Sequence, residues 1–217
     1  MDKFNYDIVL FDLDGTLTDS IDGIVNAVKY SCRNLGLRIP DAQELLEFIG
    51  PPMTESFSTH FGLKGEENKK AMELYHVYYA DKGWKENKVY DGITEMLENL
   101  KKKGKTLALC TNKPAHYAKD IMDYFDLTKY MDYIGGRNDE QGITSKWKVI
   151  DHTLKMLNAE DINKAIMVGD RHFDVEGADI VGIKTIGVTF GYGTRKELEE
   201  SGAVVVVDTP KELADLF

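Results

Sequence analysis

Two aspartates, one residue apart, follow an apolar run near the N-terminus. The run Ile8-Val9-Leu10-Phe11 is rich in β-formers, and Asp12-Leu13-Asp14-Gly15-Thr16 comes directly after it. Such a run predicts a strand buried on both faces, as in a parallel α/β sheet. Asp12 then lies at the carboxyl end of the strand, the edge where open α/β sheets bind ligands. Two carboxylates there can hold a metal ion and attack phosphorus. Taken alone, the segment is equally typical of a simple turn in which Gly15 supplies φ > 0.

A second polar segment, Cys110-Thr111-Asn112-Lys113-Pro114, follows a predicted buried strand at 106–110. We expect it to open a helix, so that the Thr111 hydroxyl and the free amides of the helix N-terminus cradle a phosphate oxygen. Without other signals, an ordinary N-cap formed by Thr111 or Asn112 explains this segment better.

The third signal is Ser145-Lys146, at the start of a predicted helix over 147–157 and after a loop that contains glycine. A lysine there can neutralise both a carboxylate and a bound phosphate. Lys148 would face about 200° away on the same helix, so the two lysines cannot enter one site. Lysines are common on protein surfaces, and Lys146 alone is therefore a weak signal.

The fourth signal is Val168-Gly169-Asp170-Arg171-His172-Phe173-Asp174, which again follows an apolar strand. Asp170 falls at the strand end, and Asp174 lies four residues later at the start of the next helix. Together with Asp12, these carboxylates could hold Mg²⁺, which prefers oxygen ligands and keeps several waters. Helix capping is a weaker explanation, because the two carboxylates would repel each other without a cation or an ion pair.

Composition limits the function classes. The chain has 217 residues and a formal net charge of -10, which argues against nucleic acid or an anionic membrane as a partner. Cys32 and Cys110 lie outside any C-x-x-C pattern, so a disulfide framework or structural zinc site is not indicated. No signal-like N-terminus or membrane-length apolar run is present, and a cytoplasmic protein is the expectation.

Two regions differ in their patterns. Residues 19 to about 84 show helical spacing interrupted by Gly and Pro, whereas strands and helices alternate from Lys88 onward. We therefore predict an α/β core with a doubly wound parallel, Rossmann-like sheet, formed by 1–18 and 86–217, and an all-helical insertion at 19–85. Strands are predicted at 8–11, 106–110, 133–134, 165–168, 185–188 and 204–207, and core helices at 93–100, 116–125, 147–157, 175–181 and 196–201.

All four signals fall at strand ends of one predicted sheet. Their order, Asp-x-Asp-Gly-Thr, then Thr-Asn, then Lys, then Gly-Asp-x-x-x-Asp, resembles the haloacid dehalogenase-like hydrolase superfamily over almost the full chain. The helical segment resembles the cap of its phosphoglycolate phosphatase-like branch, and Phe48-Ile49-Gly50-Pro51-Pro52-Met53-Thr54-Glu55-Ser56-Phe57 is similar to cap segments there.

The resemblance implies a phosphatase with a small phosphate ester as its substrate. Asp12 would be the nucleophile that forms an aspartyl-phosphate, and Asp14 the acid and then the base. Mg²⁺ would bind the Asp12 carboxylate, the Asp14 carbonyl and Asp170, with Asp174 as a ligand or an anchor. The phosphoryl group would be bound by Thr111, Asn112 and Lys146.

Other functions remain open at this point. A 5′-nucleotidase or a pyrophosphatase would share these residues, as would a phosphomutase of the β-phosphoglucomutase type, although neither Lys64 nor His60 sits in a comparable cap setting. A non-catalytic binding protein would need neither Asp12 nor Asp14. Residues of the cap would determine which substrate is bound. Those expected near the leaving group are Arg33, Met53, Ser56 and Tyr79. The sequence is equally compatible with Met53 and Tyr79 packing in the core and with Arg33 lying in solvent.

Overall fold

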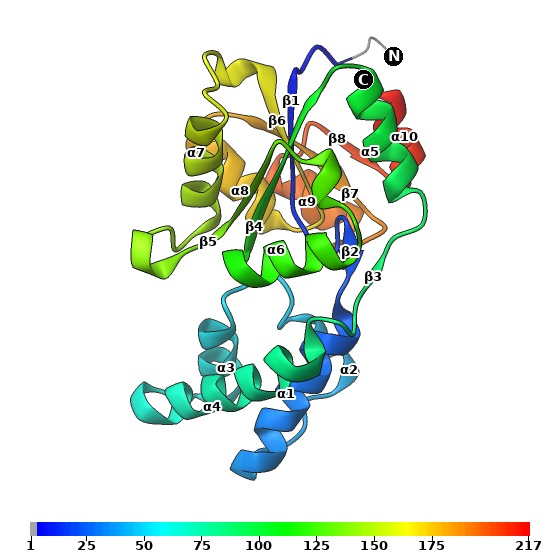
Figure 1. The fold of residues 1–217 in the computed structure, drawn as a ribbon. Coiled ribbons are helices and arrows are strands. Elements are labelled where there is room, and N and C mark those ends of the chain that lie inside the picture. The colour runs from blue at the N-terminus through cyan, green and yellow to red at the C-terminus, as the bar shows by residue number, and fades with distance from the viewer. Residues whose placement is uncertain (1–3) are drawn as a thin grey trace. The chain divides into compact units, whose positions relative to one another are not determined.

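The computed structural model describes residues 4–217, and the chain divides into two compact units (Figure 1). One unit comprises the chain up to Thr18 together with Val89–Phe217, and the other is Asp19–Lys88. Two short strands, β2 (Thr18–Asp19) and β3 (Lys88–Val89), pair where the chain passes from one unit to the other. The second boundary therefore follows Lys88, slightly later than the predicted position after residue 85.

A six-stranded parallel sheet forms the centre of the first unit. Its strand order is β5-β4-β1-β6-β7-β8, with parallel register along the sheet. The predicted doubly wound α/β fold is confirmed. The strands are β1 (Ile8–Phe11), β4 (Thr106–Pro114), β5 (Tyr133–Arg137), β6 (Ala165–Gly169), β7 (Lys184–Val188) and β8 (Val205–Val207).

Helices cover both faces of this sheet. We place α5, α6 and α10 on one face and α7, α8 and α9 on the other; α5 packs beside α10, and α7 packs beside α8 (Figure 1). This division follows from right-handed crossovers on the two sides of β1. The bounds are α5 (Ile93–Lys102), α6 (Ala115–Tyr124), α7 (Lys146–Met156), α8 (His172–Val181), α9 (Arg195–Ser201) and α10 (Pro210–Asp215), with short 3₁₀ turns at Thr128–Tyr130, Asp139–Gln141 and Ile162–Lys164.

The apolar strands explain why the sheet edge is held rigidly. Val9, Leu10 and Phe11 of β1 are fully buried, and Leu10 shares one core cluster with Ala108 of β4, Met167 of β6 and residues of α7. Burying one such side chain contributes about 1.5–3 kcal/mol. β1 lies between β4 and β6, so residues that follow it start from a backbone fixed on both sides.

The second unit is built of helices, apart from Asp19 and Lys88 at its ends, which belong to the short strands β2 and β3. It contains α1 (Ile21–Leu35), α2 (Ala42–Leu46), α3 (Met53–Phe61), α4 (Gly65–Tyr78) and one π-helical turn at Tyr79–Gly83. Helix α1 packs on α4, and the Ser31 hydroxyl donates to the Ala71 carbonyl over 3.0 Å. Gly36 and Gly62 have φ of 67° and 69° and end α1 and α3, because glycine enters the left-handed region without strain. Within residues 4–217, none of the helices has the length and apolarity needed to cross a membrane.

Candidate active site

Three buried aspartates converge at the carboxyl edge of the sheet. Asp12 follows β1, Asp170 follows β6, and Asp174 lies in the first turn of α8. The Asp12 amide donates to the Val168 carbonyl over 3.0 Å, which ties the end of β1 to its neighbouring strand. Each aspartate offers a carboxylate oxygen, and these oxygens lie within 4.8 Å of one another. The sequence placed these three residues together, and the structure brings them into one cluster.

Lys146 supplies the positive charge of this cluster. It is the first residue of α7 and its side chain is buried, with Nζ 2.7 Å from Asp12 Oδ1 and 2.6 Å from Asp174 Oδ1. The competing lysine, Lys148, instead donates to the Gly142 carbonyl over 3.0 Å. Of the two lysines, Lys146 therefore contacts the aspartate cluster, whereas Lys148 bonds to the loop before α7.

Burial and mutual repulsion disfavour ionised carboxylates here. Desolvation, opposed by Lys146 and reinforced by Asp174, raises the pKa of Asp12 to about 6. Desolvation and the neighbouring carboxylates also raise the pKa of Asp170 well above its ordinary value. One lysine therefore does not compensate for three buried carboxylates, and the cluster favours additional positive charge.

The donor set fits a hard divalent cation. Asp170 Oδ1 is buried and has no hydrogen-bond partner among the described residues, whereas Asp170 Oδ2 accepts the Tyr192 amide over 2.8 Å. A buried, unpaired carboxylate oxygen is costly, and a cation bound there would remove that cost. Carboxylate oxygens are the ligands that Mg²⁺ prefers.

Asp14 has a partner that the sequence interpretation missed. Its Oδ2 lies 2.6 Å from Nζ of Lys113, and both side chains are largely buried. Asp14 Oδ1 is buried without a hydrogen-bond partner among residues 4–217. The Asp14 carboxylate is outside the three-aspartate cluster, so its carboxylate is available for a role other than metal binding.

The region around Thr111 differs from the expected one. Strand β4 continues to Pro114, with a register shift between Thr111 and Pro114, and α6 begins only at Ala115. The prediction that Thr111 opens a helix, or that Thr111 or Asn112 caps one, is therefore wrong. The physical reason is Pro114, because the residue before a proline avoids the helical region. Thr111 is buried at the sheet edge, and its Oγ1 accepts the Lys113 amide over 3.2 Å.

The longer strand also explains how Lys113 was missed. Side chains two residues apart in a strand point to the same face. A strand extended through Pro114 would have indicated that Lys113 accompanies Thr111.

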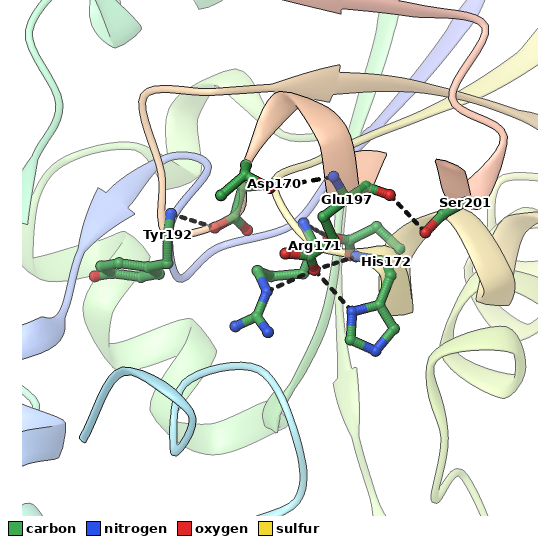
Figure 2. A network of polar contacts seen from close by, with 8 residues as sticks. Asp170, Arg171, His172, Tyr192, Glu197 and Ser201 are labelled. Carbon is green, nitrogen blue, oxygen red and sulfur yellow. Dashed lines mark hydrogen bonds and ion pairs between the residues drawn. The ribbon is translucent and has the colours of Figure 1, made fainter. Parts of the chain in front are cut away.

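The loop that follows β7 approaches Asp170 closely, and its Tyr192 amide donates to Asp170 Oδ2 (Figure 2). A Cβ on Gly15, which has φ +86°, would collide with the Asp170 carboxylate, and a Cβ on Gly193 would collide with the Asp170 carbonyl. Close backbone approach therefore needs glycine at both positions. This layer around Asp170 was not part of the sequence prediction.

The raised aspartate pKa values predict an unusual pH dependence of stability. Asp12 has a pKa of about 6 in the folded protein and 3.8 in the unfolded chain. Between these two pH values, and in EDTA, the folded protein therefore binds more protons than the unfolded chain. Stability should therefore rise as pH falls from 7.5 to 5, by about 1–2 kcal/mol from Asp12 alone. Glu197 opposes this only below about pH 4.5: burial would raise its pKa, but hydrogen bonds from His172 and Arg171 lower it to about 2.

Thermal melts in EDTA at pH 7.5, 6 and 5 measure this dependence. The control variant is Asp12→Asn, in which the rise should be smaller because one titrating carboxylate is gone. A melting temperature of the unaltered protein that falls steadily over this range would contradict the prediction.

Comparison with known families decides what kind of protein carries this site. The model of the family described as haloacid dehalogenase-like hydrolase matches residues 9–188. The chain belongs to the haloacid dehalogenase-like hydrolase family. The match runs from β1 to the end of β7 and therefore includes each strand that leads into the site. The resemblance predicted from the four motifs is confirmed.

Relatives of this haloacid dehalogenase-like hydrolase carry several names. A tyrosine-protein kinase, PtkA, from Mycobacterium tuberculosis is 35% identical over 199 residues, covering 92% of this chain and 67% of that protein. A 5′-nucleotidase from Pseudomonas aeruginosa is 36% identical over 195 residues, covering 89% and 87%. A phosphoglycolate phosphatase from Vibrio parahaemolyticus is 27% identical over 222 residues, covering 96% and 95%.

The fold of this haloacid dehalogenase-like hydrolase agrees with that of a solved structure over nearly the whole chain. The crystal structure of a predicted phosphatase from Clostridium acetobutylicum superposes with a TM-score of 0.92 at 40% identity and covers 98% of both chains. The chain is therefore an enzyme of this hydrolase family and belongs among its phosphatases.

Proposed function

We propose that this enzyme is a Mg²⁺-dependent phosphomonoesterase that hydrolyses small phosphorylated metabolites, as phosphoglycolate phosphatases do, through a phosphorylated aspartate. The observation that carries the proposal is the placement of Asp12 between Lys146 and two further buried carboxylates, with Asp14 two residues beyond it. In this proposal, Asp12 is the nucleophile and Asp14 the proton carrier, both just after β1, and Lys146 at the start of α7 supplies positive charge.

The proposed reaction has two steps. An Asp12 carboxylate oxygen attacks phosphorus, so that an Asp12–phosphate bond forms while the bond to the ester oxygen breaks. Asp14 gives its proton to the departing alcohol. Water then attacks the phosphorus of the aspartyl-phosphate, Asp14 takes a proton from that water, and inorganic phosphate leaves with Asp12 restored.

The remaining residues bind and neutralise. Lys146, Thr111 and Asn112 would bind the equatorial phosphoryl oxygens, whose charge needs positioned donors. Asp12, Asp170, the Asp14 carbonyl and Asp174 would hold Mg²⁺. The ion, when bound, would offset the charge of the phosphate dianion and so reduce its repulsion by Asp12.

We assign the helical unit, predicted as 19–85, the role of a cap that selects the substrate. Of the four residues expected to face the leaving group, Ser56 and Tyr79 are buried, and the Tyr79 ring stacks on that of Tyr75 with centroids 5.4 Å apart. Arg33 is exposed in the last turn of α1. These contacts favour core packing for Tyr79 and a solvated Arg33, while Met53 and Ser56 remain candidates for substrate contact.

Nucleoside monophosphates are the second candidate substrate class. The relative named 5′-nucleotidase shares more identity with this chain than the one named phosphoglycolate phosphatase. Both reactions present the same phosphate group to the core, so they differ only in what the cap must recognise.

We also propose a cytoplasmic location for the enzyme, because Cys32 and Cys110 are both free and buried, which suits a reducing compartment.

A phosphate-release screen tests the proposal. The purified enzyme is incubated with phosphoglycolate, nucleoside monophosphates, pyrophosphate and sugar phosphates, with MgCl₂ or with EDTA. We expect release from monoesters with Mg²⁺ and none with EDTA. Release that is equal in EDTA would refute the metal requirement. Isomerisation of a sugar phosphate faster than phosphate release would show a mutase, and transfer to a tyrosine peptide without release would show a kinase.

A further inference from the structure

A single oxygen of Glu197 accepts hydrogen bonds from the segment between Asp170 and Asp174, where α8 begins (Figure 2). Glu197 Oε1 lies 2.9 Å from Arg171 Nε, 3.0 Å from the His172 amide and 2.7 Å from His172 Nδ1. Glu197 is in the first turn of α9, whereas Arg171 is the N-cap of α8 and His172 is its first residue. The side chain thus links two elements that are separated in sequence.

The linked segment is the one on which the metal site depends. Asp170 directly precedes Arg171, and Asp174 lies in the first turn of α8, with Oδ2 3.1 Å from the Arg171 amide. The His172 amide is one of the free donors at the start of α8, and Glu197 satisfies it from outside the helix. Restraining Arg171 and His172 therefore restrains Asp170 and Asp174 on either side.

Glu197 itself is held firmly. Its amide donates to Thr194 Oγ1 over 3.1 Å, and its carbonyl accepts the Ser201 hydroxyl over 2.8 Å. The next residue, Leu198, is fully buried. Helix α9 also packs against β7 and β8, so Glu197 can act as a rigid support, which a side chain on a mobile loop could not.

We propose that Glu197 is a positioning residue for the divalent-cation site: it holds Asp170 and Asp174 at the spacing that binds the ion, without contacting ion or substrate. This inference rests on the proposed Mg²⁺-dependent function. The Tyr192 amide, from the segment between β7 and α9, fixes one oxygen of Asp170, and Glu197 fixes the backbone that follows Asp170. Groups behind metal ligands commonly change metal affinity by about 10–100-fold when they are removed.

Isothermal titration of the metal-free enzyme with MgCl₂ alone tests the proposal. Glu197→Gln is close in shape but weakens all three accepted bonds, and Glu197→Asp keeps the charge but shortens the reach. We expect both to raise the Mg²⁺ dissociation constant by about 10-fold or more. The matched control is Glu200→Gln on the same helix, which removes an equal charge from an exposed side chain and should leave the constant unchanged.

The outcomes separate positioning from simpler roles. Glu197→Gln that melts at a lower temperature but binds Mg²⁺ as the unaltered enzyme does would show a purely structural role and overturn the proposal. Weakened binding in Glu197→Gln but not in Glu197→Asp would show a long-range charge effect and also overturn it. If Glu197 variants do not fold, His172→Ala removes one of the three donors, and unchanged Mg²⁺ binding there would count against the proposal. Absence of Mg²⁺ binding by the unaltered enzyme would refute both this proposal and the metal requirement, whereas Mg²⁺ binding without phosphate release would refute the proposed function alone.

Discussion

An Asp12→Asn variant is expected to lose phosphatase activity by at least about 10³-fold in kcat, because an amide oxygen is a poor nucleophile and cannot form the phosphorylated intermediate. Asn has nearly the size of Asp, and its oxygen can still accept from Lys146 Nζ, which lies 2.7 Å from Asp12 Oδ1. The variant should therefore fold. Its melting temperature in EDTA at pH 7.5 should equal or exceed that of the unaltered enzyme, because one buried carboxylate of the repelling cluster becomes neutral.

The measurement is phosphate release at saturating substrate, together with mass spectrometry of acid-quenched enzyme. The unaltered enzyme should show phosphate on the peptide that contains Asp12, and the variant should not. Asp151→Asn is the matched control, because Asp151 is a half-exposed residue of α7 that pairs only along its own helix with Lys155 among the described residues. A variant at Asp12 that keeps more than a tenth of the activity would rule out the aspartyl-phosphate route.

The fold was predictable because buried parallel strands carry a strong local signal. β1 and β6 are continuous apolar runs, and their bounds agree with the predicted ones to within one residue. The short helices α2 and α10 were not anticipated. Helix α10 has only six residues, which is too short for a helical repeat of apolar residues to be recognised. Its Thr209 cap and its first residue, Pro210, are helix-start signals, but they are weak without such a repeat.

The site was most predictable where residues follow strand ends directly. Asp12 and Asp170 meet because parallel strands deliver their carboxyl ends to one edge, and Lys146 joins them from the start of α7. Lys113 and Glu197 depend on other information: Lys113 on the bulge that extends β4, and Glu197 on the packing of α9 against the loop after β6. Neither has a sequence spacing to its partner that is fixed by helix or strand geometry. Tertiary contacts of this kind cannot be derived from periodicity.

Lys146→Met is expected to impair both stability and catalysis. The substitution keeps the apolar stem but removes the cation that contacts Asp12 and Asp174, so that three buried carboxylates within 4.8 Å of one another remain. Removing one partner of a buried ion pair costs about 3–5 kcal/mol, which corresponds to a fall in melting temperature of roughly 10 °C for a chain of this size. The activity should fall by about 10²-fold or more even with Mg²⁺, because a donor to the phosphoryl group is lost.

Thermal melts at several pH values, with and without MgCl₂, and phosphate release measure these effects, with Lys148→Met as the control two residues along α7. The loss of stability should shrink as pH falls toward 5, because protonated carboxylates no longer repel, and Mg²⁺ should raise the melting temperature of Lys146→Met more than that of the unaltered enzyme. A lysine that merely packs would give a loss independent of both pH and Mg²⁺. Dependence on both would instead show that Lys146 balances the charge of the carboxylates that the enzyme uses.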